Sequence, residues 1–437
     1  MSFYERPEHE PCVFYNSWKT DSSNNAVLLL LFTATSTIGG EMAVDKKDAL
    51  TAIISGGSLS GLMVAIVLKR LGFRVTVFER STTVQSQGAG IVLGKWSTAF
   101  FQEFDKTKTE IALYYTLRAN YDGFIKEGYI NDISAAAVKD DRAEYFMGKT
   151  VVSHSYDSHL KAVNVTVRNG DGSEDHFVAD LFVCAEGGSS SSREIYFPGL
   201  PRTYAGYLAF RGLVPEKDLE PDTAKTLIHS LSRSFSTNLA VPGPNGATTV
   251  GNRHMNFVWY NTIPEGAVLD KVLTDINGKR RPFSVSAGYM PQSVVEEEIH
   301  PRAFAKLSPQ CLEVVMKTKH PFVQVVTDVI ASSAVFHDGH VILVGDALSG
   351  ARPHTTASTN QAADHALRLF LTLKTNTCDL SGLKAEWEPG SLQYSKYLWE
   401  IGAAIGNLSQ FGDHPMNVDR QMPHRALEEW MKVGEPK

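Results

Sequence analysis

The chain has 437 residues and a formal net charge of −6 at pH 7, with 43% hydrophobic and 21% charged residues. These values are ordinary for a globular enzyme and allow two or three domains. They do not favour a nucleic-acid-binding protein, because no long run of Lys or Arg is present. The four cysteines are widely spaced without a CxxC pair, so we expect no metal site and a reducing, cytoplasmic location.

The first forty residues differ in composition from the rest. Residues 22–40 carry no charge, and their apolar run at 26–32 is too short to span a bilayer. The residues before this run are acidic-leaning rather than basic, which disfavours a secretory signal without removing that alternative. Met42 stands just ahead of the first predicted strand. We therefore expect residues 1–41 to be a dispensable extension, and we expect no firm membrane association.

Residues 51–80 have the order of a dinucleotide-binding βαβ unit: strand, glycine turn, helix, strand and acid. Gly56 permits the tight turn, and Gly61 lets the following helix pack close to the strand. Ser58 occupies the position of the usual middle glycine, where the backbone approaches a pyrophosphate at the helix N-terminus. Glu79 follows Gly56 by 23 residues, where a carboxylate can bind ribose hydroxyls. The alternative is that this βαβ unit has only a structural role and binds no dinucleotide.

Beyond this unit, the sequence predicts both strands and helices. A glycine turn at 88–90 leads into a predicted strand, and a short helix is predicted at 113–119. The alternating runs at 163–167 and 181–184 predict strands, with a hairpin turn at 169–172.

Further runs at 247–250 and 256–260 are also strand-like, and the apolar strand at 341–344 ends in Gly345-Asp346-Ala347 before a helix at 361–374. Strands alternate with helices at both ends of the chain, and the sequence between is β-rich. This order predicts an α/β protein with an inserted β-sheet domain.

Several motifs together resemble one enzyme family. They are GGSLSG at 56–61, VFERS with Glu79-Arg80, GAGIVL at 88–93, CAEGGSSSSR at 184–193, YAGYLAFRG at 204–212, NFVWY at 256–260 and VILVGDALSGARPH at 341–354. They resemble the single-component FAD-dependent aromatic hydroxylases, built like p-hydroxybenzoate and salicylate hydroxylase. Within that family the 2,6-dihydroxypyridine 3-hydroxylase subgroup is the most similar. The resemblance covers roughly residues 51–408.

The resemblance implies a Rossmann-like FAD-binding domain, p-hydroxybenzoate hydroxylase-like, with an inserted substrate-binding β-sheet domain. We expect the discontinuous FAD-binding domain at 42–200 and 325–410, with part of the substrate sheet near 120–180. We expect the substrate-binding domain at 201–324. Residues 411–437 would form a C-terminal tail or a contact in a homodimer.

The resemblance also implies a reaction. NADPH or NADH would reduce the FAD, O₂ would add to give a flavin C4a-hydroperoxide, and this species would hydroxylate a small aromatic or N-heteroaromatic substrate. The protein would orient the ring and exclude water. Two alternatives stay open: a flavin-fold paralogue that is inactive or does not hydroxylate, and an FAD-dependent epoxidase, oxidase or halogenase.

The family's site residues map onto particular positions of this chain. Those implied to bind the cofactor are Gly56, Ser58, Gly61, Glu79, Arg80, Gly88, Ala89, Gly90, Arg193, Asp346 and Pro353. His354 and Tyr207 are the catalytic candidates: His354 as a proton acceptor, and Tyr207 as a lining of the ring pocket with Trp259 and Tyr260. The alternatives are a helix cap for Asp346, a surface ion pair for Arg193, a loop hydrogen bond for His354 and simple core packing for the aromatic residues.

Three departures from the family pattern stand out. Glu186 replaces the family's aspartate, and Ser358-Thr359 replace glycines that would let the backbone approach the flavin. The segment 105–110 is several dozen residues shorter than in the family, and an acid, Glu110, falls where an arginine is often found. These departures keep the inactive alternative open.

Overall fold

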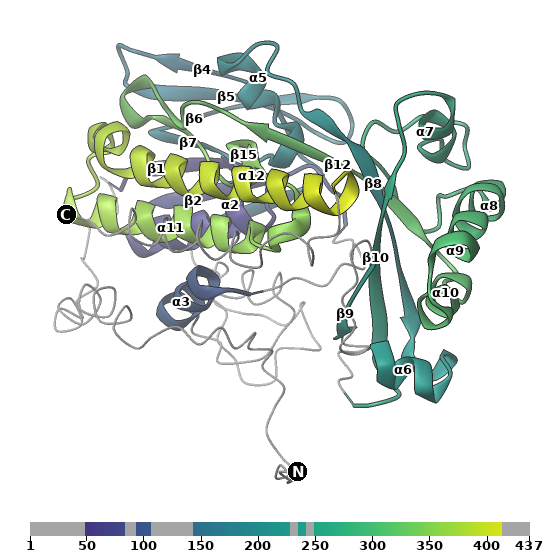
Figure 1. The fold of residues 1–437 in the computed structure, drawn as a ribbon. Coiled ribbons are helices and arrows are strands. Elements are labelled where there is room, and N and C mark those ends of the chain that lie inside the picture. The colour runs from purple at the N-terminus through teal and green to yellow at the C-terminus, as the bar shows by residue number, and fades with distance from the viewer. Residues whose placement is uncertain (1–48, 84–92, 106–142, 228–234, 242–248, 413–437) are drawn as a thin grey trace, which may run out of the picture. The chain divides into compact units, whose positions relative to one another are not determined.

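The computed structural model describes residues 49–83, 93–105, 143–227, 235–241 and 249–412 (Figure 1). The described residues all lie in one compact unit, which begins at Lys46. Several predictions lie outside the described residues: the extension 1–41, Gly88, Ala89 and Gly90, the helix at 113–119, Glu110 and all of the C-terminal tail except residues 411–412.

The first layer is a six-stranded sheet in the order β13-β14-β7-β1-β2-β3. Its pairings are parallel except for that of β13 with β14. The strands are β1 (Thr51–Ser55), β2 (Arg74–Glu79), β3 (Ala143–Met147), β7 (Leu181–Cys184), β13 (Val335–Phe336) and β14 (Val341–Leu343). The predicted βαβ unit is confirmed, because β1 and β2 are adjacent and parallel and are joined by α2 (Leu59–Arg70).

Helices cover this sheet. They are α2, α11 (Ser358–Thr375) and α12 (Glu388–Gln410), and α3 (Lys95–Phe104) packs on α11. In Figure 1, α11 and α2 lie next to each other, and α12 runs along the same side of the molecule. The eight consecutive buried residues 61–68 in α2 explain this position, because a helix that is apolar nearly all round must be enclosed.

A separate three-stranded antiparallel sheet contains β4 (Thr150–Asp157), β5 (Ala162–Arg168) and β6 (Glu174–Ala179). The predicted hairpin turn at 169–172 is confirmed between β5 and β6. The expectation that residues near 120–180 join the substrate sheet is wrong for these strands. Alternation of apolar residues identified strands here but could not say which sheet they join.

The second large sheet has the order β11-β12-β8-β10-β9. Its strands are β8 (Thr203–Pro215), β9 (Phe235–Val241), β10 (His254–Thr262), β11 (Ser284–Val285) and β12 (Phe322–Ile330), and β15 (Ser349–Gly350) pairs with β12. On one face, residues such as Phe210, Trp259 and Val323 form a buried core cluster with residues of the helices. These helices are α6 (Pro221–Leu227), α7 (Ala267–Val272), α8 (Gln292–Val294), α9 (His300–Lys306) and α10 (Pro309–Met316).

Strand alternation divides the side chains of this sheet between two faces. Met255, Phe257 and Trp259 point into the core cluster, so Asn256 and Tyr260 lie on the opposite face. Antiparallel pairing places Tyr207 and Arg211 of β8 on that same face. We call this opposite face the site face.

Short helical segments complete the described chain. They are α5 (Ser191–Tyr196), the 3-10 turns Gly187–Ser189, Glu216–Asp218, His337–Gly339, Gly345–Ala347, Pro353–Thr355 and Leu380–Gly382, and the π-helical turns Val295–Ile299 and Leu383–Trp387. Among the described residues, no helix has both the length and the apolar character needed to cross a membrane.

Candidate functional site

Three turns lie at one edge of the parallel sheet. They follow β1, β7 and β14, which are adjacent parallel strands, so the turns at 56–61, 186–189 and 345–347 meet where those strands end. In open α/β sheets, ligands bind in the crevice outside the carboxyl ends of the strands. This edge is therefore the candidate cofactor site.

The first turn is closely packed. A Cβ atom on Gly61 would collide with the carbonyl oxygen of Gly56, and one on Gly56 would collide with that of Ala185. Backbone atoms cannot retreat as a side chain can, so a larger residue would move the helix off the strand. These contacts agree with the roles predicted for both glycines.

The N-terminus of α2 fits a phosphate group. Ser58 is exposed at the N-cap, its side chain does not cap the helix, and the first turn holds no acid. Free N–H groups and the positive end of the helix dipole therefore face outward, as an anion requires. Glu79 accepts a hydrogen bond from Gly57 N at 2.9 Å and one from Ser81 N at 2.8 Å, which fixes its carboxylate beside the turn. Arg80 is exposed at the end of β2.

Arg193 links the second and third turns. It is only 5% exposed, and its guanidinium donates to the carbonyl oxygens of Gly188 at 2.5 Å and Ala347 at 3.0 Å. A surface ion pair is therefore not its role. Burial lowers the pKa of Arg193 and raises that of the Asp346 carboxyl, which Arg202 and Arg193 pull back down. Among the described residues, no donor forms a hydrogen bond to the Asp346 carboxylate.

Glu186 has a structural role that the sequence did not reveal. Its carboxylate accepts hydrogen bonds from Ser55 Oγ at 2.8 Å, Ser190 Oγ at 2.7 Å and Ser192 N at 2.9 Å. The acid therefore ties the end of β1 to the start of α5. The serine run at 189–192 was the available signal, because short hydroxyl side chains next to an acid favour such local hydrogen bonds.

Tyr207 and His354 form a pair on the site face. The Tyr207 hydroxyl lies 2.7 Å from His354 Nε2, and the Tyr260 ring lies 4.6 Å from the His354 ring. His354 belongs to the turn Pro353–Thr355, which brings Pro353 to the same place. Trp259 instead points into the core cluster, so the expectation that it lines the ring pocket is wrong.

Packing and charge constrain this pair. Gly406 of α12 lies against it, since a Cβ there would collide with the Tyr207 hydroxyl and sit 2.9 Å from His354 Nε2. Burial, with a smaller contribution from Arg352, lowers the pKa of His354 to about 4. Burial raises the pKa of Tyr207 to about 12. Both groups are therefore neutral near pH 7, and the Arg352 charge is balanced by Asp328 at 2.5 Å.

Two polar residues of the site face, Arg211 and Asn256, were not predicted from the sequence. Arg211 donates to Gln324 at 3.3 Å, but its Nε has no partner among the described residues, and burial lowers its pKa. Asn256 is 1% exposed, and neither atom of its amide has a described partner. Unpaired buried polar groups are costly, so a ligand that pairs with them would relieve that cost. A charged residue between the buried residues of a strand was the available signal for Arg211.

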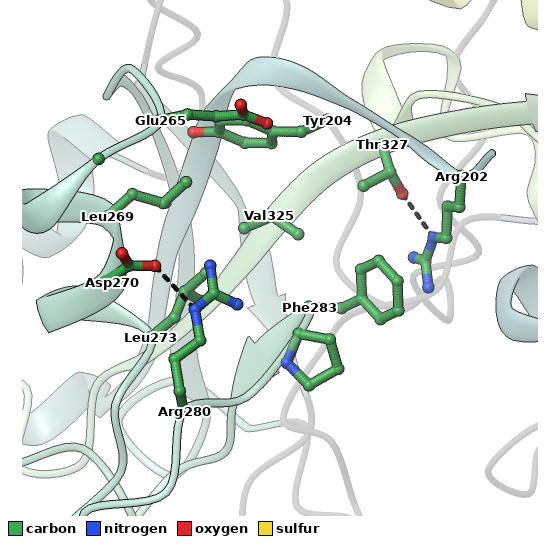
Figure 2. Close-up of a pocket in the computed structure, with 12 residues that line it drawn as sticks. Arg202, Tyr204, Glu265, Leu269, Asp270, Leu273, Arg280, Phe283, Val325 and Thr327 are labelled. Carbon is green, nitrogen blue, oxygen red and sulfur yellow. Dashed lines mark hydrogen bonds and ion pairs between the residues drawn. The ribbon is translucent and has the colours of Figure 1, made fainter.

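A separate groove of about 310 Å³ opens on the core-cluster side of the second sheet (Figure 2). Val325, Leu269 and Leu273 contribute apolar surface to it. Figure 2 shows Arg202 bound to Thr327 at one end and Arg280 paired with Asp270 at the other. The groove contains neither Tyr207 nor His354, so it is not the predicted ring pocket.

Family models match two parts of the chain. The model for the pyridine nucleotide-disulphide oxidoreductases matches residues 51–103, and the FAD binding domain-like model matches residues 204–328. The first of these matches includes the glycine turn and α2. The second includes most of the large antiparallel sheet.

A curated relative matches most of the chain. The 2,6-dihydroxypyridine 3-monooxygenase of Paenarthrobacter nicotinovorans is 28% identical over 377 residues, covering 82% of this chain and 91% of the relative. The structure of 2,6-dihydroxypyridine-3-hydroxylase from Arthrobacter nicotinovorans superposes with a TM-score of 0.68 at 25% identity, covering 85% of this chain and 95% of that one. The chain resembles the FAD-dependent aromatic hydroxylases. The resemblance recognised in the motifs is thereby confirmed.

More distant structures support the fold alone. A salicylate hydroxylase in its substrate complex superposes with a TM-score of 0.58 at 16% identity, covering 89% of this chain and 95% of that one. HpxO of Klebsiella pneumoniae, complexed with FAD and uric acid, gives 0.55 at 18% identity, covering 88% and 92%. The predicted α/β fold class, a p-hydroxybenzoate hydroxylase-like FAD-binding domain with a β-sheet insertion, is confirmed.

Proposed function

We propose that this protein is an FAD-dependent monooxygenase that hydroxylates a small aromatic or N-heteroaromatic substrate with O₂ and NADPH or NADH. The observation that carries the proposal is the Tyr207–His354 pair, in which His354 belongs to the segment that follows the turn at 345–347 and Tyr207 belongs to the second sheet. Residues 42–200 with 325–410 would bind FAD, and residues 201–324 would bind the substrate. The similarity to a monooxygenase over most of the chain supports this assignment.

The residues at the sheet edge fit FAD. The free N-terminus of α2 at Ser58 suits the pyrophosphate, and Glu79 has carboxylate lone pairs left for ribose hydroxyls. The Asp346 carboxylate would bind the ribityl chain or the pyrophosphate. Arg193 would hold the turn at 345–347 in place through its carbonyl oxygens. Bound FAD would take a hydride from NAD(P)H and activate O₂ for oxygen transfer.

Tyr207 and His354 would transfer a proton away from the substrate. A substrate hydroxyl bound to Tyr207 could pass its proton through the tyrosine to His354 Nε2, and the ring would become more electron-rich. A pKa of about 4 makes His354 too weak a base to retain that proton near pH 7. We therefore assign the pair as a relay: His354 Nε2 would accept the proton from Tyr207, and Nδ1 would release the proton that it already carries to solvent.

Arg211 would orient the substrate. It lies on the site face, its Nε has no partner among the described residues, and it carries a positive charge. A ring that bears oxygen or nitrogen acceptors would pair with it. The balanced reaction is substrate–H + O₂ + NAD(P)H + H⁺ → substrate–OH + H₂O + NAD(P)⁺.

The test begins with the absorption spectrum of the purified protein. We expect a yellow protein, or one that becomes yellow with added FAD, and NADPH or NADH oxidation that accelerates with 2,6-dihydroxypyridine or salicylate. Mass spectrometry should then detect a product heavier by one oxygen atom, labelled when ¹⁸O₂ is supplied. A protein that takes up no FAD would contradict the proposal. FAD uptake with reduction of O₂ but no labelled product would indicate an oxidase instead.

A further inference from the structure

A buried histidine of α11 is hydrogen-bonded to the turn at 345–347. His365 lies on α11 and is fully buried. Its Nδ1 accepts a hydrogen bond from Gly345 N at 3.0 Å, and its Nε2 lies 3.0 Å from Ser395 Oγ on α12. Because a backbone N–H can only donate, Nδ1 must be unprotonated, so the ring proton is on Nε2 and is donated to Ser395.

The ring stays neutral. Burial, with a smaller contribution from Arg368, lowers the pKa of His365 to about 3. Its other neighbours are Trp387, whose Nε1 donates to the His365 carbonyl at 3.0 Å, and Asp364, whose carboxylate is bound by Arg368. The acceptor at Nδ1 is therefore present throughout the physiological pH range.

Gly345 is closely packed on its other side. It has φ +57°, and Ser60 Oγ of the first turn of α2 occupies the place where a Cβ atom would lie. The same turn is held through the carbonyl oxygens of Asp346 and Ala347 by Arg193. The turn is thus fixed between α2, α11 and Arg193, and Asp346 is its central residue.

We propose that His365 is a positioning residue for cofactor binding: by accepting the Gly345 N–H, it fixes the turn that presents Asp346 to FAD. This inference rests on the proposed function, because it assumes that FAD occupies the sheet edge. The imidazole does not touch the cofactor. It acts by holding one backbone group in place.

Substitutions at His365 can distinguish an effect on the position of the turn at 345–347 from an effect on the stability of the whole fold. In His365→Asn, the side-chain oxygen can take the place of Nδ1, so we expect the FAD dissociation constant to stay within about threefold of wild type. His365→Gln can reach Ser395 but cannot place an acceptor at Nδ1, and His365→Leu has no acceptor at all. Both should weaken FAD binding by about tenfold or more, which corresponds to about 1.4 kcal/mol.

Ser395→Ala is the matched control. It removes the Ser395 hydroxyl that lies beside Nε2, where the Ser391 backbone also interacts with the ring, and it leaves the Gly345 hydrogen bond intact. It should lower the melting temperature of the FAD-free protein while leaving FAD affinity within about twofold. FAD affinity is measured by fluorescence titration and stability by thermal unfolding, so neither readout depends on turnover.

The outcomes distinguish the two proposals. Wild type that binds FAD, with weakened binding in His365→Gln and recovery in His365→Asn, supports the positioning role. If all variants bind FAD equally and differ only in melting temperature, the role of His365 is merely structural and this inference fails alone. If wild type itself binds no FAD, both proposals fail. Should His365→Leu not fold, the comparison of Asn with Gln decides.

Discussion

The two halves of the candidate site are built from different parts of the polypeptide. The edge of the parallel sheet consists mainly of backbone groups, namely the free N–H groups of α2, the turn at 345–347 and carbonyl oxygens held by Arg193, with the Glu79 and Asp346 carboxylates beside them. The site face of the second sheet presents side chains, chiefly Tyr207 and Arg211. A backbone site tolerates no added atoms, whereas a side-chain site can change its chemistry by substitution. The first half should therefore be sensitive to volume and the second to functional groups.

The strongest disruption of the backbone half is Gly61→Val. The added atoms would collide with the Gly56 carbonyl and push α2 away from β1. We expect a loss of unfolding free energy of about 3 kcal/mol and FAD binding weaker by about a hundredfold or more, measured by denaturant unfolding and fluorescence titration. Gly170→Ala is the control, because a Cβ there meets nothing within 4 Å. Equal FAD affinity in the two variants would count against the assigned edge.

Gly406→Ala tests the side-chain half without changing any of its functional groups. The new methyl group would displace the Tyr207 hydroxyl from His354 Nε2. We expect kcat to fall by about tenfold to a hundredfold, as for loss of general acid–base assistance, while FAD affinity stays within about twofold. Ala404→Ser, at an exposed position of the same helix, should leave both values unchanged. An unchanged kcat in Gly406→Ala would mean that the pair takes no part in turnover.

Arg211→Gln tests whether the positive charge on the site face contributes to substrate binding. It removes the charge but retains a donor, so we expect KM for an acidic ring such as salicylate to rise by about tenfold, with FAD affinity unchanged. Arg211→Lys keeps the charge and should recover part of that loss. Steady-state kinetics with both variants provides the measurement. A KM that moves equally in both variants would point to altered shape rather than charge.

The last prediction concerns the dependence of stability on pH. His354 has a pKa near 4 in the folded protein and about 6.5 when unfolded, so between these values the unfolded chain binds the extra proton. Stability should fall as pH drops from 6.5 to 4. In His354→Gln the slope over this interval should be shallower, by at most about 1.4 kcal/mol per pH unit. Urea unfolding at pH 4.5, 5.5 and 7 measures it, and parallel slopes in the two proteins would contradict the assigned burial.

The backbone half of the site could largely be predicted from the sequence. Gly56, Gly61 and Glu79 have fixed spacings within one short segment, so their placement at the sheet edge followed from local pattern. The strand at 341–344 and the helix after it were likewise recognisable as an apolar run and a helical period. The fold class needed little more than these elements and the β-rich sequence between them.

The side-chain half was harder to predict because its residues come from distant strands. Trp259 and Tyr260 are neighbours in sequence but point to opposite faces, and only the pairing of β10 with β8 decides which one meets Tyr207. Glu186 was identified only as a departure from the family, because its serine partners depend on how α5 folds back onto β1. Pairing register and long-range contacts are set by the packed chain, not by local spacing.

The insertion of β14 beside β7 has a consequence for synthesis of the protein. β7 ends at Cys184, yet the strand that covers its edge begins only at Val341. A nascent chain therefore presents an open β-edge while more than 150 further residues leave the ribosome, and such edges invite aggregation. Efficient production in a cell should accordingly depend on chaperones that shield this edge until the last part of the chain arrives.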